Sequence, residues 1–399
     1  MMRKAAIGLA LAWVLLMACG GALAQTAEEI TGQCSLRDAG GRALACLSDG
    51  RYDTSWSAYG KEARLVLNAQ EAPIHGVYLQ FYNYACPFEV QAKDAQGKWQ
   101  RIAACDTEYL TGYAAWPEGA TEIRIRPTRS SDRLALAEVH LFGKGEMPDW
   151  VQRWQPPLEK ADLLVVAAHP DDELLFMGGT IPYYAGERGM AVQAAYLVPA
   201  TPYRKLELLD GLWLCGAVHY PDIGTFPDRF ALSVSGMYAQ EGWSEVRVLR
   251  HMVGLYRRYQ PDVVVTHDVQ GEYGHGAHRA AADAAQKAVA LAADAAYQHR
   301  SLPQTTPWTV KKLYLHLYDR GEIRMDWRVP LEAFGGRTAF DMAEAAFACH
   351  ISQQDTEYRV EDFGPYDNAR FGLAWTMVGE DCEKNDFFEH MDGNSQLCK

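Results

Sequence analysis

The six residues Ala168-His169-Pro170-Asp171-Asp172-Glu173 bring an imidazole and three carboxylates together. They follow the apolar run Leu163–Ala167, which predicts a buried β-strand. Ligands of open α/β sheets bind beyond the carboxyl ends of the strands, so chemistry is expected at this place. The imidazole of His169 and the carboxylate of Asp172 are ligands that zinc accepts, while Asp171 remains free to act as a base on water.

A second polar segment has the same design. Residues 262–266 predict another buried strand, and the loop after it leads to His275 and His278 at the start of a predicted helix. Residues three apart share one face of a helix, so both imidazoles can point at one centre. One of them would complete three protein ligands with His169 and Asp172 and leave a fourth position open, as in catalytic zinc sites. The other is then free to stabilise an oxyanion or to protonate a leaving group.

The elements that must hold these loops alternate between strand and helix from about Leu158 onward. This alternation predicts parallel βαβ units, and hence a three-layer, Rossmann-like α/β domain with a mostly parallel sheet. The strands are expected at 162–168, 191–198 and 262–266, and the helices at 173–188, 204–217, 244–259 and 278–298.

The first part of the chain has a different pattern. From about Thr31 to Phe142, apolar residues recur at every second position in short runs separated by turns such as Asp49-Gly50. This pattern is typical of an all-β sandwich. The predicted organisation is therefore a signal peptide at 1–24, a β-sandwich at 30–145, a polar linker at 146–157 and the α/β domain at 158–399.

The first 24 residues indicate export. Arg3 and Lys4 precede an apolar run that ends in Ala22-Leu23-Ala24, the pattern of a signal peptide cleaved after Ala24. Lipoprotein processing at Cys19 is the alternative. Either route leads to a secreted, extracellular or cell-surface protein. No later apolar stretch approaches the roughly 20 residues that a transmembrane helix requires, so no transmembrane segment is expected after the signal peptide.

Net charge indicates which binding partners are excluded, and cysteine content indicates which disulfides can form. The net charge is −13, and loss of Arg3 and Lys4 with the signal peptide would make it −15, which repels phosphate backbones and argues against nucleic acid as a partner. Export permits disulfides among the nine cysteines. Cys34 with Cys46, Cys86 with Cys105, and Cys382 with Cys398 are plausible pairs, whereas Cys215 and Cys349 are expected to be buried free thiols.

Several segments of the first half resemble the discoidin, or coagulation factor type C, family: Asp49–Trp56, Gly97–Ile102, Ile123–Pro127 and Leu136–Gly143. The resemblance implies a jelly-roll module that binds sugars. Six aromatic residues can either stack on sugar rings or belong to the core, namely Trp56, Tyr82, Tyr84, Tyr109, Tyr113 and Trp116.

Ala168–Glu173 and Gly274–His278 together resemble the PIG-L/LmbE-like family of zinc-dependent N-acetyl-sugar deacetylases. The resemblance implies an N-acetylated sugar or glycoconjugate as substrate and zinc, or another divalent metal, as cofactor. It implies these roles: His169, Asp172 and His278 as metal ligands, Asp171 as general base, His275 as an electrostatic or acid group, and Tyr273 as a stabiliser of the transition state.

Three further residues are interpreted more openly. Arg204 is expected either to contact the substrate or to pair with Glu207, and Asp228 either to contact the substrate or to serve in a turn. The family commonly has Pro-Asp between the two histidines of the second motif, where this chain has Gly276-Ala277. Asp228 or Asp268 is a candidate to replace the missing carboxylate beside His275.

These observations favour an exported metal-dependent hydrolase that removes acetyl groups from N-acetylated sugars. One alternative is a noncatalytic glycan-binding protein whose α/β domain has lost activity. A second alternative keeps the zinc chemistry but changes the substrate to a different acylamide.

Overall fold

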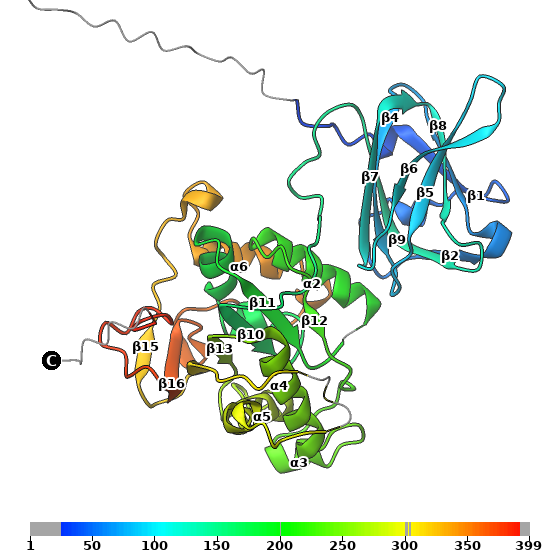
Figure 1. The fold of residues 1–399 in the computed structure, drawn as a ribbon. Coiled ribbons are helices and arrows are strands. Elements are labelled where there is room, and N and C mark those ends of the chain that lie inside the picture. The colour runs from blue at the N-terminus through cyan, green and yellow to red at the C-terminus, as the bar shows by residue number, and fades with distance from the viewer. Residues whose placement is uncertain (1–24, 200, 300–301, 303–304, 392–399) are drawn as a thin grey trace, which may run out of the picture.

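The computed structural model describes residues 25–199, 201–299, 302 and 305–391, and it contains two antiparallel β-sheets followed by one larger mixed sheet (Figure 1). The predicted signal peptide lies outside the described residues. Among the residues described, no helix combines the length and the apolar character needed to cross a membrane.

The N-terminal region is all-β, as predicted. One sheet has the order β1 (Cys34–Asp38), β3 (Leu65–Ala69), β8 (Glu122–Pro127), β5 (Phe88–Lys93) and β6 (Trp99–Cys105). The other has the order β2 (Trp56–Tyr59), β9 (Arg133–Phe142), β4 (Ile74–Phe81) and β7 (Thr111–Ala120). Short 3-10 helices lie at Thr31–Gln33, Ala45–Leu47 and Gly60–Glu62.

The apolar residues that recur at every second position of these strands are buried between the two sheets. Leu65 and Leu67 of the first sheet pack in the same hydrophobic core as Val77 and Leu79 of the second, and all four side chains are fully buried. Trp56 and Trp116 also belong to this core, so they are packing residues. Tyr84, by contrast, is exposed. Apolar side chains at every second residue therefore hold the two sheets together.

The large sheet has the order β12 (Asp222–Ile223), β11 (Val192–Tyr196), β10 (Leu163–Ala167), β13 (Val263–Thr266), β14 (Lys312–His316), β16 (Arg370–Thr376) and β15 (Glu322–Arg324). The strands from β12 to β14 run parallel to one another, whereas β16 pairs antiparallel with both β14 and β15. The sheet is thus mostly parallel, as expected.

Helices cover both faces of this sheet and give it three layers. They are α1 (Asp172–Leu175), α2 (Pro202–Leu214), α3 (Val234–Tyr238), α4 (Glu245–Tyr259), α5 (Gly276–Ala293) and α6 (Ala339–Ala348). Shorter 3-10 turns lie at Glu332–Phe334, Ile351–Gln353 and Gly364–Tyr366.

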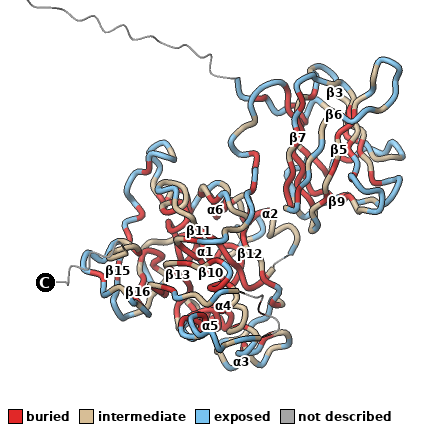
Figure 2. The backbone as a smooth tube through the Cα atoms, in the orientation of Figure 1, coloured by how far each residue is buried: buried red, intermediate tan, exposed pale blue. Residues whose placement is uncertain are grey.

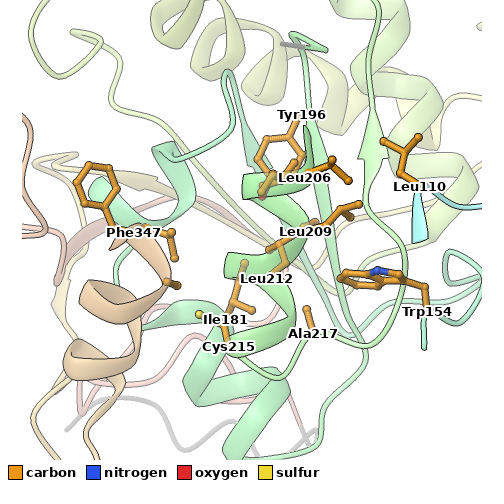
Figure 3. Close-up of a cluster of buried hydrophobic side chains, with 14 of the residues drawn as sticks. Leu110, Trp154, Ile181, Tyr196, Leu206, Leu209, Leu212, Cys215, Ala217 and Phe347 are labelled. Atoms are coloured by element: carbon orange, nitrogen blue, oxygen red, sulfur yellow. The ribbon is translucent and has the colours of Figure 1, made fainter. Parts of the chain in front are cut away.

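Successive residues of β10 face opposite layers. Leu163 and Val165 share a core with α2 and α6, whereas Leu164 and Val166 pack in a second core with α4 and α5. Figure 2 shows buried residues concentrated on these central strands, and Figure 3 shows the side chains that α2 contributes to the first core, among them Leu206, Leu209 and Leu212. Burial on both faces explains why the central strands are continuous apolar runs.

The predicted helix over 173–188 is wrong as a single element. Helix α1 ends at Leu175, and a π-helical segment covers Pro182–Glu187. Gly178 lies between them at a φ of +46°, and a Cβ at Gly179 would come within 2.7 Å of the Trp327 ring. Two consecutive glycines, at a place where other chain segments approach closely, thus interrupt the helix. The glycine pair was a local signal that the prediction did not use. Helix α5 also ends at Ala293, short of the predicted 298.

The local disulfides expected in the first half are also wrong. Cys34, Cys46, Cys86 and Cys105 are free thiols. The thiol of Cys34 donates to the carbonyl of Ile30 instead. Cys215 and Cys349 are free as predicted, although Cys349 is only half-buried. Cys382 is disulfide-bonded, while its expected partner Cys398 lies outside the described residues.

Candidate metal and catalytic site

The loop after β10 places Asp171 in a strained conformation at the start of α1. Its φ of 106° lies in the left-handed region, which disfavours any residue with a side chain. Asp171 nevertheless has a buried carboxylate that accepts a hydrogen bond from the guanidinium of Arg204, at 2.9 Å. Arg204 also donates to the carbonyl of Pro170, at 2.7 Å. Helix α2 therefore holds this turn through one arginine, which does not pair with Glu207 as one reading suggested.

The three predicted metal ligands come together. Oδ2 of Asp172 lies 3.2 Å from Nδ1 of His169 and 3.3 Å from Nε2 of His278. Two ligand atoms on a tetrahedral zinc ion, each bonded at about 2.1 Å, are separated by about 3.4 Å. These two spacings suit a small divalent cation. The donor atoms that lie within 4.8 Å of one another form two overlapping sets, His169 with His275 and His278, and Asp172 with His267 and His278.

A buried ring nitrogen supplies a second test of the fit. Nε2 of His278 is buried and makes no hydrogen bond, whereas Nδ1 donates to Oε2 of Glu272 at 2.7 Å. This bond places the proton of a neutral imidazole on Nδ1 and leaves a lone pair on Nε2. A histidine that binds metal needs this arrangement, with a carboxylate behind the ring.

Glu272 orients two further imidazoles that the sequence did not single out. Its carboxylate accepts hydrogen bonds from Nδ1 of His267 and Nδ1 of His316, at 3.2 and 2.9 Å. Burial alone would raise the pKa of Glu272, but His267 and His278 hold it well below its usual range. His267 comes directly after β13, and Glu272 lies in the same polar loop as Tyr273. Their positions beyond the end of a buried strand could therefore have indicated them as site residues.

His267 also touches the metal-binding carboxylate. Its Nε2 accepts a hydrogen bond from the backbone of Ala168 at 2.9 Å and lies 3.4 Å from Oδ2 of Asp172. Burial lowers the pKa of His267, but Glu272 and Asp172 raise it to about 10, which alone would favour a charged ring. The backbone N–H of Ala168 requires an unprotonated Nε2, so the geometry favours a neutral ring with its proton on Nδ1, facing Glu272. His267 thus belongs to the support of the site, and its ring stacks on that of His278 with centroids 4.1 Å apart.

The adjacent carboxylates of Asp171 and Asp172 differ in acidity. Burial, together with the charge of Asp172, raises the pKa of Asp171 to about 7, against the opposing effect of Arg204. For Asp172, burial acts in the same direction, but His278 and His169 hold its pKa well below its usual range. Neighbouring carboxylates with separated pKa values suit separate tasks, one as a ligand and one as a base. A cation bound beside Asp171 would lower its pKa again.

His275 forms the N-cap of α5. Its Nδ1 accepts a hydrogen bond from the backbone N–H of Ala277 at 3.3 Å. Burial and the charges of His278 and His169 lower its pKa to about 3, so the ring is neutral and carries its proton on Nε2. His275 is therefore a hydrogen-bond donor toward the site. A backbone amide, not a carboxylate, sets its tautomer.

Neither candidate to replace the missing carboxylate contacts His275. Asp268 accepts a hydrogen bond from the backbone of Gln270, and Asp228 lies 3.8 Å from Nε2 of His169. Asp228 is largely exposed beside the metal ligands, which leaves it available to a substrate. The ring of Tyr273 packs against His275 and His278, with centroids 5.6 and 5.3 Å away.

Comparison with known proteins identifies the family. The PIG-L family model, described as GlcNAc-PI de-N-acetylase, matches residues 164–289, the span that carries both motifs. A 1D-myo-inositol 2-acetamido-2-deoxy-alpha-D-glucopyranoside deacetylase of Streptomyces scabiei is 31% identical over 237 residues, which are 50% of this chain and 67% of that protein. The enzyme of the same name from Rhodococcus erythropolis is 32% identical over 203 residues, 42% of this chain and 68% of that protein. The chain belongs to the PIG-L family of de-N-acetylases.

Solved structures with partial similarity include the N,N'-diacetylchitobiose deacetylase of Pyrococcus horikoshii, which is 20% identical with a TM-score of 0.38 and matches 50% of this chain and 74% of that one. The conserved protein TT1542 of Thermus thermophilus is 26% identical with a TM-score of 0.36, matching 48% of this chain and 80% of that one.

Proposed function

We propose that this protein is an exported zinc-dependent hydrolase that removes the acetyl group from N-acetylated sugars, N-acetylglucosamine conjugates in particular. The observation that carries the proposal is the buried Asp171 carboxylate beside the converging His169, Asp172 and His278, in a chain whose family and relatives are named as deacetylases of acetamido sugars.

His169, Asp172 and His278 would hold the zinc ion, with Glu272 fixing the orientation of His278. Zinc supplies Lewis-acid chemistry, which polarises an amide carbonyl and lowers the pKa of a water molecule. A neutral imidazole and an ionised carboxylate are the protonation states that such binding requires, and the pKa shifts of Asp172 and His278 favour both.

The remaining side chains carry out the proton chemistry. Asp171 accepts a proton from the attacking water, and Arg204 keeps its carboxylate in place. The N–H of His275 donates to the oxygen on which negative charge develops, with Tyr273 beside it. Asp171 then returns the proton to the nitrogen as the C–N bond breaks, so that acetate and an amino sugar are released.

The proposal extends to the whole chain. Residues 1–24 serve as a signal peptide, 30–145 as a discoidin-like jelly-roll module that binds glycan, 146–157 as a linker and 158–399 as the deacetylase domain. The mass of the protein recovered outside producing cells tests the first point. A chain beginning at Gln25 supports cleavage after Ala24, and a lipid-modified Cys19 would contradict it.

Acetate release from N-acetylglucosamine conjugates tests the activity. The holoenzyme should release acetate, and a chelator or Asp171→Ala should abolish release, with zinc still bound in the variant. Asp94→Ala, in an exposed turn of the N-terminal region, is the control and should keep full activity. Unchanged acetate release in Asp171→Ala would overturn the assigned base, and faster turnover of simple acylamides than of acetylated sugars would overturn the assigned substrate.

A further inference from the structure

The N-terminal β region and the linker contact α2 through a half-buried polar side chain. Asp210 of α2 accepts hydrogen bonds from the hydroxyl of Tyr52 and from the amide of Gln152, both at 2.5 Å. Tyr109 of the β region also stacks on Tyr220, which follows α2, with ring centroids 4.5 Å apart. Hydrogen bonds and stacked rings of this kind fix the orientation of the β region relative to α2. Residues of the β region can therefore form a binding site together with residues of the α/β region.

A pocket of about 470 Å³ lies where the two parts meet. Such a volume is within the range of small-molecule sites. The β region lines it with the loop Gly50–Asp53, and the α/β region lines it with Tyr203, Glu207, Ile351 and Ser352.

The pocket is next to the catalytic site. Tyr203 and Glu207 are one turn apart on α2, and Arg204 between them donates to the carboxylate of Asp171. Ser352 on the opposite wall donates through its backbone and its hydroxyl to Glu207, at 2.8 and 2.6 Å. Arg204 thus links the α2 wall of the pocket to the turn that carries Asp171.

The lining has the chemistry of a sugar site. Arg51 and Asp53 form an exposed ion pair at 2.7 Å, which offers both donors and acceptors to hydroxyl groups, and the half-buried ring of Tyr203 offers an apolar face. The charged residues are one guanidinium and two carboxylates, Asp53 and Glu207. This balance favours a neutral sugar over a sulfated or uronic one.

We propose that this pocket binds the sugar unit next to the one that is deacetylated, so that the substrate is a neutral N-acetylated oligosaccharide or conjugate of at least two units. This inference rests on the proposed deacetylase function. The β region then contributes Arg51 and Asp53 directly to substrate binding, in addition to any site of its own.

Kinetics on N-acetylglucosamine and on triacetylchitotriose test the proposal. Arg51→Ala should raise the KM for the trisaccharide about tenfold, because a hydrogen bond to a charged group is lost, and should leave the KM for the monosaccharide unchanged. The matched control is Arg42→Ala, which breaks another exposed arginine–aspartate pair of the same region, with Asp38 at 3.0 Å, away from the pocket. Calorimetric binding of the trisaccharide to Asp171→Ala, with and without Arg51→Ala, gives a readout that needs no turnover.

Three results would each overturn a different part of the proposal. Equal effects of Arg51→Ala on both substrates, or no effect on the trisaccharide, would overturn the subsite. Absence of acetate release from every sugar, with trisaccharide affinity still lowered by Arg51→Ala, would overturn the deacetylase and leave the sugar site standing. Tighter binding of a hyaluronan tetrasaccharide than of the neutral trisaccharide would overturn the preference for a neutral ligand.

Discussion

His275 and His278 lie three residues apart at the start of α5, but their nitrogens have different partners. In His278, Nδ1 is bound to the Glu272 carboxylate and Nε2 is left as a buried lone pair. In His275, Nδ1 accepts from a backbone amide, so Nε2 carries the proton. One imidazole is prepared to bind a cation and the other to donate a hydrogen bond, although the sequence motif presents them as equivalent.

This difference predicts the behaviour of two matched variants. His278→Gln should weaken zinc affinity by 10-fold or more, because the variant loses both a ligand and the contact with Glu272 that orients it. Losses of roughly this size are usual when a metal site is disturbed. His275→Gln should keep zinc affinity and lower kcat by about 100-fold or more, the usual cost of a lost oxyanion donor. Competition with a chromophoric chelator measures the first effect, and acetate release at saturating zinc measures the second. If His275→Gln lost zinc as readily as His278→Gln, the assignment of ligands would be wrong.

At the residue scale, the sequence predicted the site residues that lie within its two local motifs. Types and spacing indicated His169, Asp172 and one of the two histidines of the second motif as metal ligands, and the family resemblance implied His278. In the structure, the Asp172 carboxylate lies beside both His169 and His278. The sequence did not indicate that Glu272 serves three imidazoles. One of these, on His316, comes from β14 about forty residues away, and such a convergence depends on strand order.

Helix α1 begins at a residue whose backbone is poorly suited to its side chain. Asp171 occupies a φ of 106°, where glycine alone is unstrained. Asp171→Gly and Asp171→Ala remove the same carboxylate and the same contact with Arg204, so comparing the two isolates the backbone. The glycine variant should unfold at higher denaturant concentration than the alanine variant, by about 1 kcal/mol in free energy of unfolding. Equal stability of the two inactive variants would show that the turn stores no strain.

Helix α5 depends on a buried arginine of its neighbour α4. The guanidinium of Arg257 donates to the carbonyls of Leu291 and Ala292 in the last turn of α5 and to those of Asp294 and Tyr297 just beyond it. Arg257→Leu should therefore cost about 3 kcal/mol of unfolding free energy, because a buried guanidinium with four hydrogen bonds is lost and the carbonyls of Leu291, Asp294 and Tyr297 lose this donor.

The next residue supplies the control for this effect. Arg258 pairs with Asp222 at 3.1 Å but its side chain is more than half exposed, so Arg258→Leu should cost less than about 1 kcal/mol. Urea unfolding followed by circular dichroism measures both variants. A loss in Arg258→Leu as large as that in Arg257→Leu would contradict this account of how α5 ends.

At the element scale, the sequence predicted the regular elements better than the interrupted ones. Strands β10 and β13 and helix α4 lie within about a residue of their predicted ranges, because apolar periodicity and the capping residue Ser244 mark them locally. The break after α1 is different. The pair Gly178-Gly179 marked it locally, but the reason for two glycines there, the close contact of Gly179 with the distant Trp327, is visible only in the fold.

At the scale of the whole molecule, the two kinds of periodicity predicted an all-β region and an α/β region, but not how they meet. Their contact depends on single polar residues on α2. Asp210, for which the sequence indicated no role, accepts hydrogen bonds from both Tyr52 and Gln152. The pocket beside Arg51 exists only through this packing, so no pattern within either region could have predicted it.

The half-buried Asp210 makes the contact between the two regions sensitive to pH. Burial raises its pKa to about 6 in spite of the hydrogen bonds from Tyr52 and Gln152, whereas in the unfolded chain it is close to 3.8. Because the folded state binds this proton more tightly, stability should fall as pH rises from about 4 to about 6 and stay lower above it, by roughly 3 kcal/mol for this group.

Comparison with Asp210→Asn separates this effect from all other titrations. The asparagine cannot ionise, so the free energy of unfolding of the variant relative to the original protein should increase between pH 4 and pH 7 and level off above that. Asp94→Asn is the control, because hydrogen bonds from Gln100 and the backbone lower the pKa of Asp94, which keeps it ionised in both states above about pH 5. Its difference from the original protein should be flat from pH 5 to pH 8. A flat difference for Asp210→Asn as well would mean that the carboxylate is solvated and that the two regions do not enclose it.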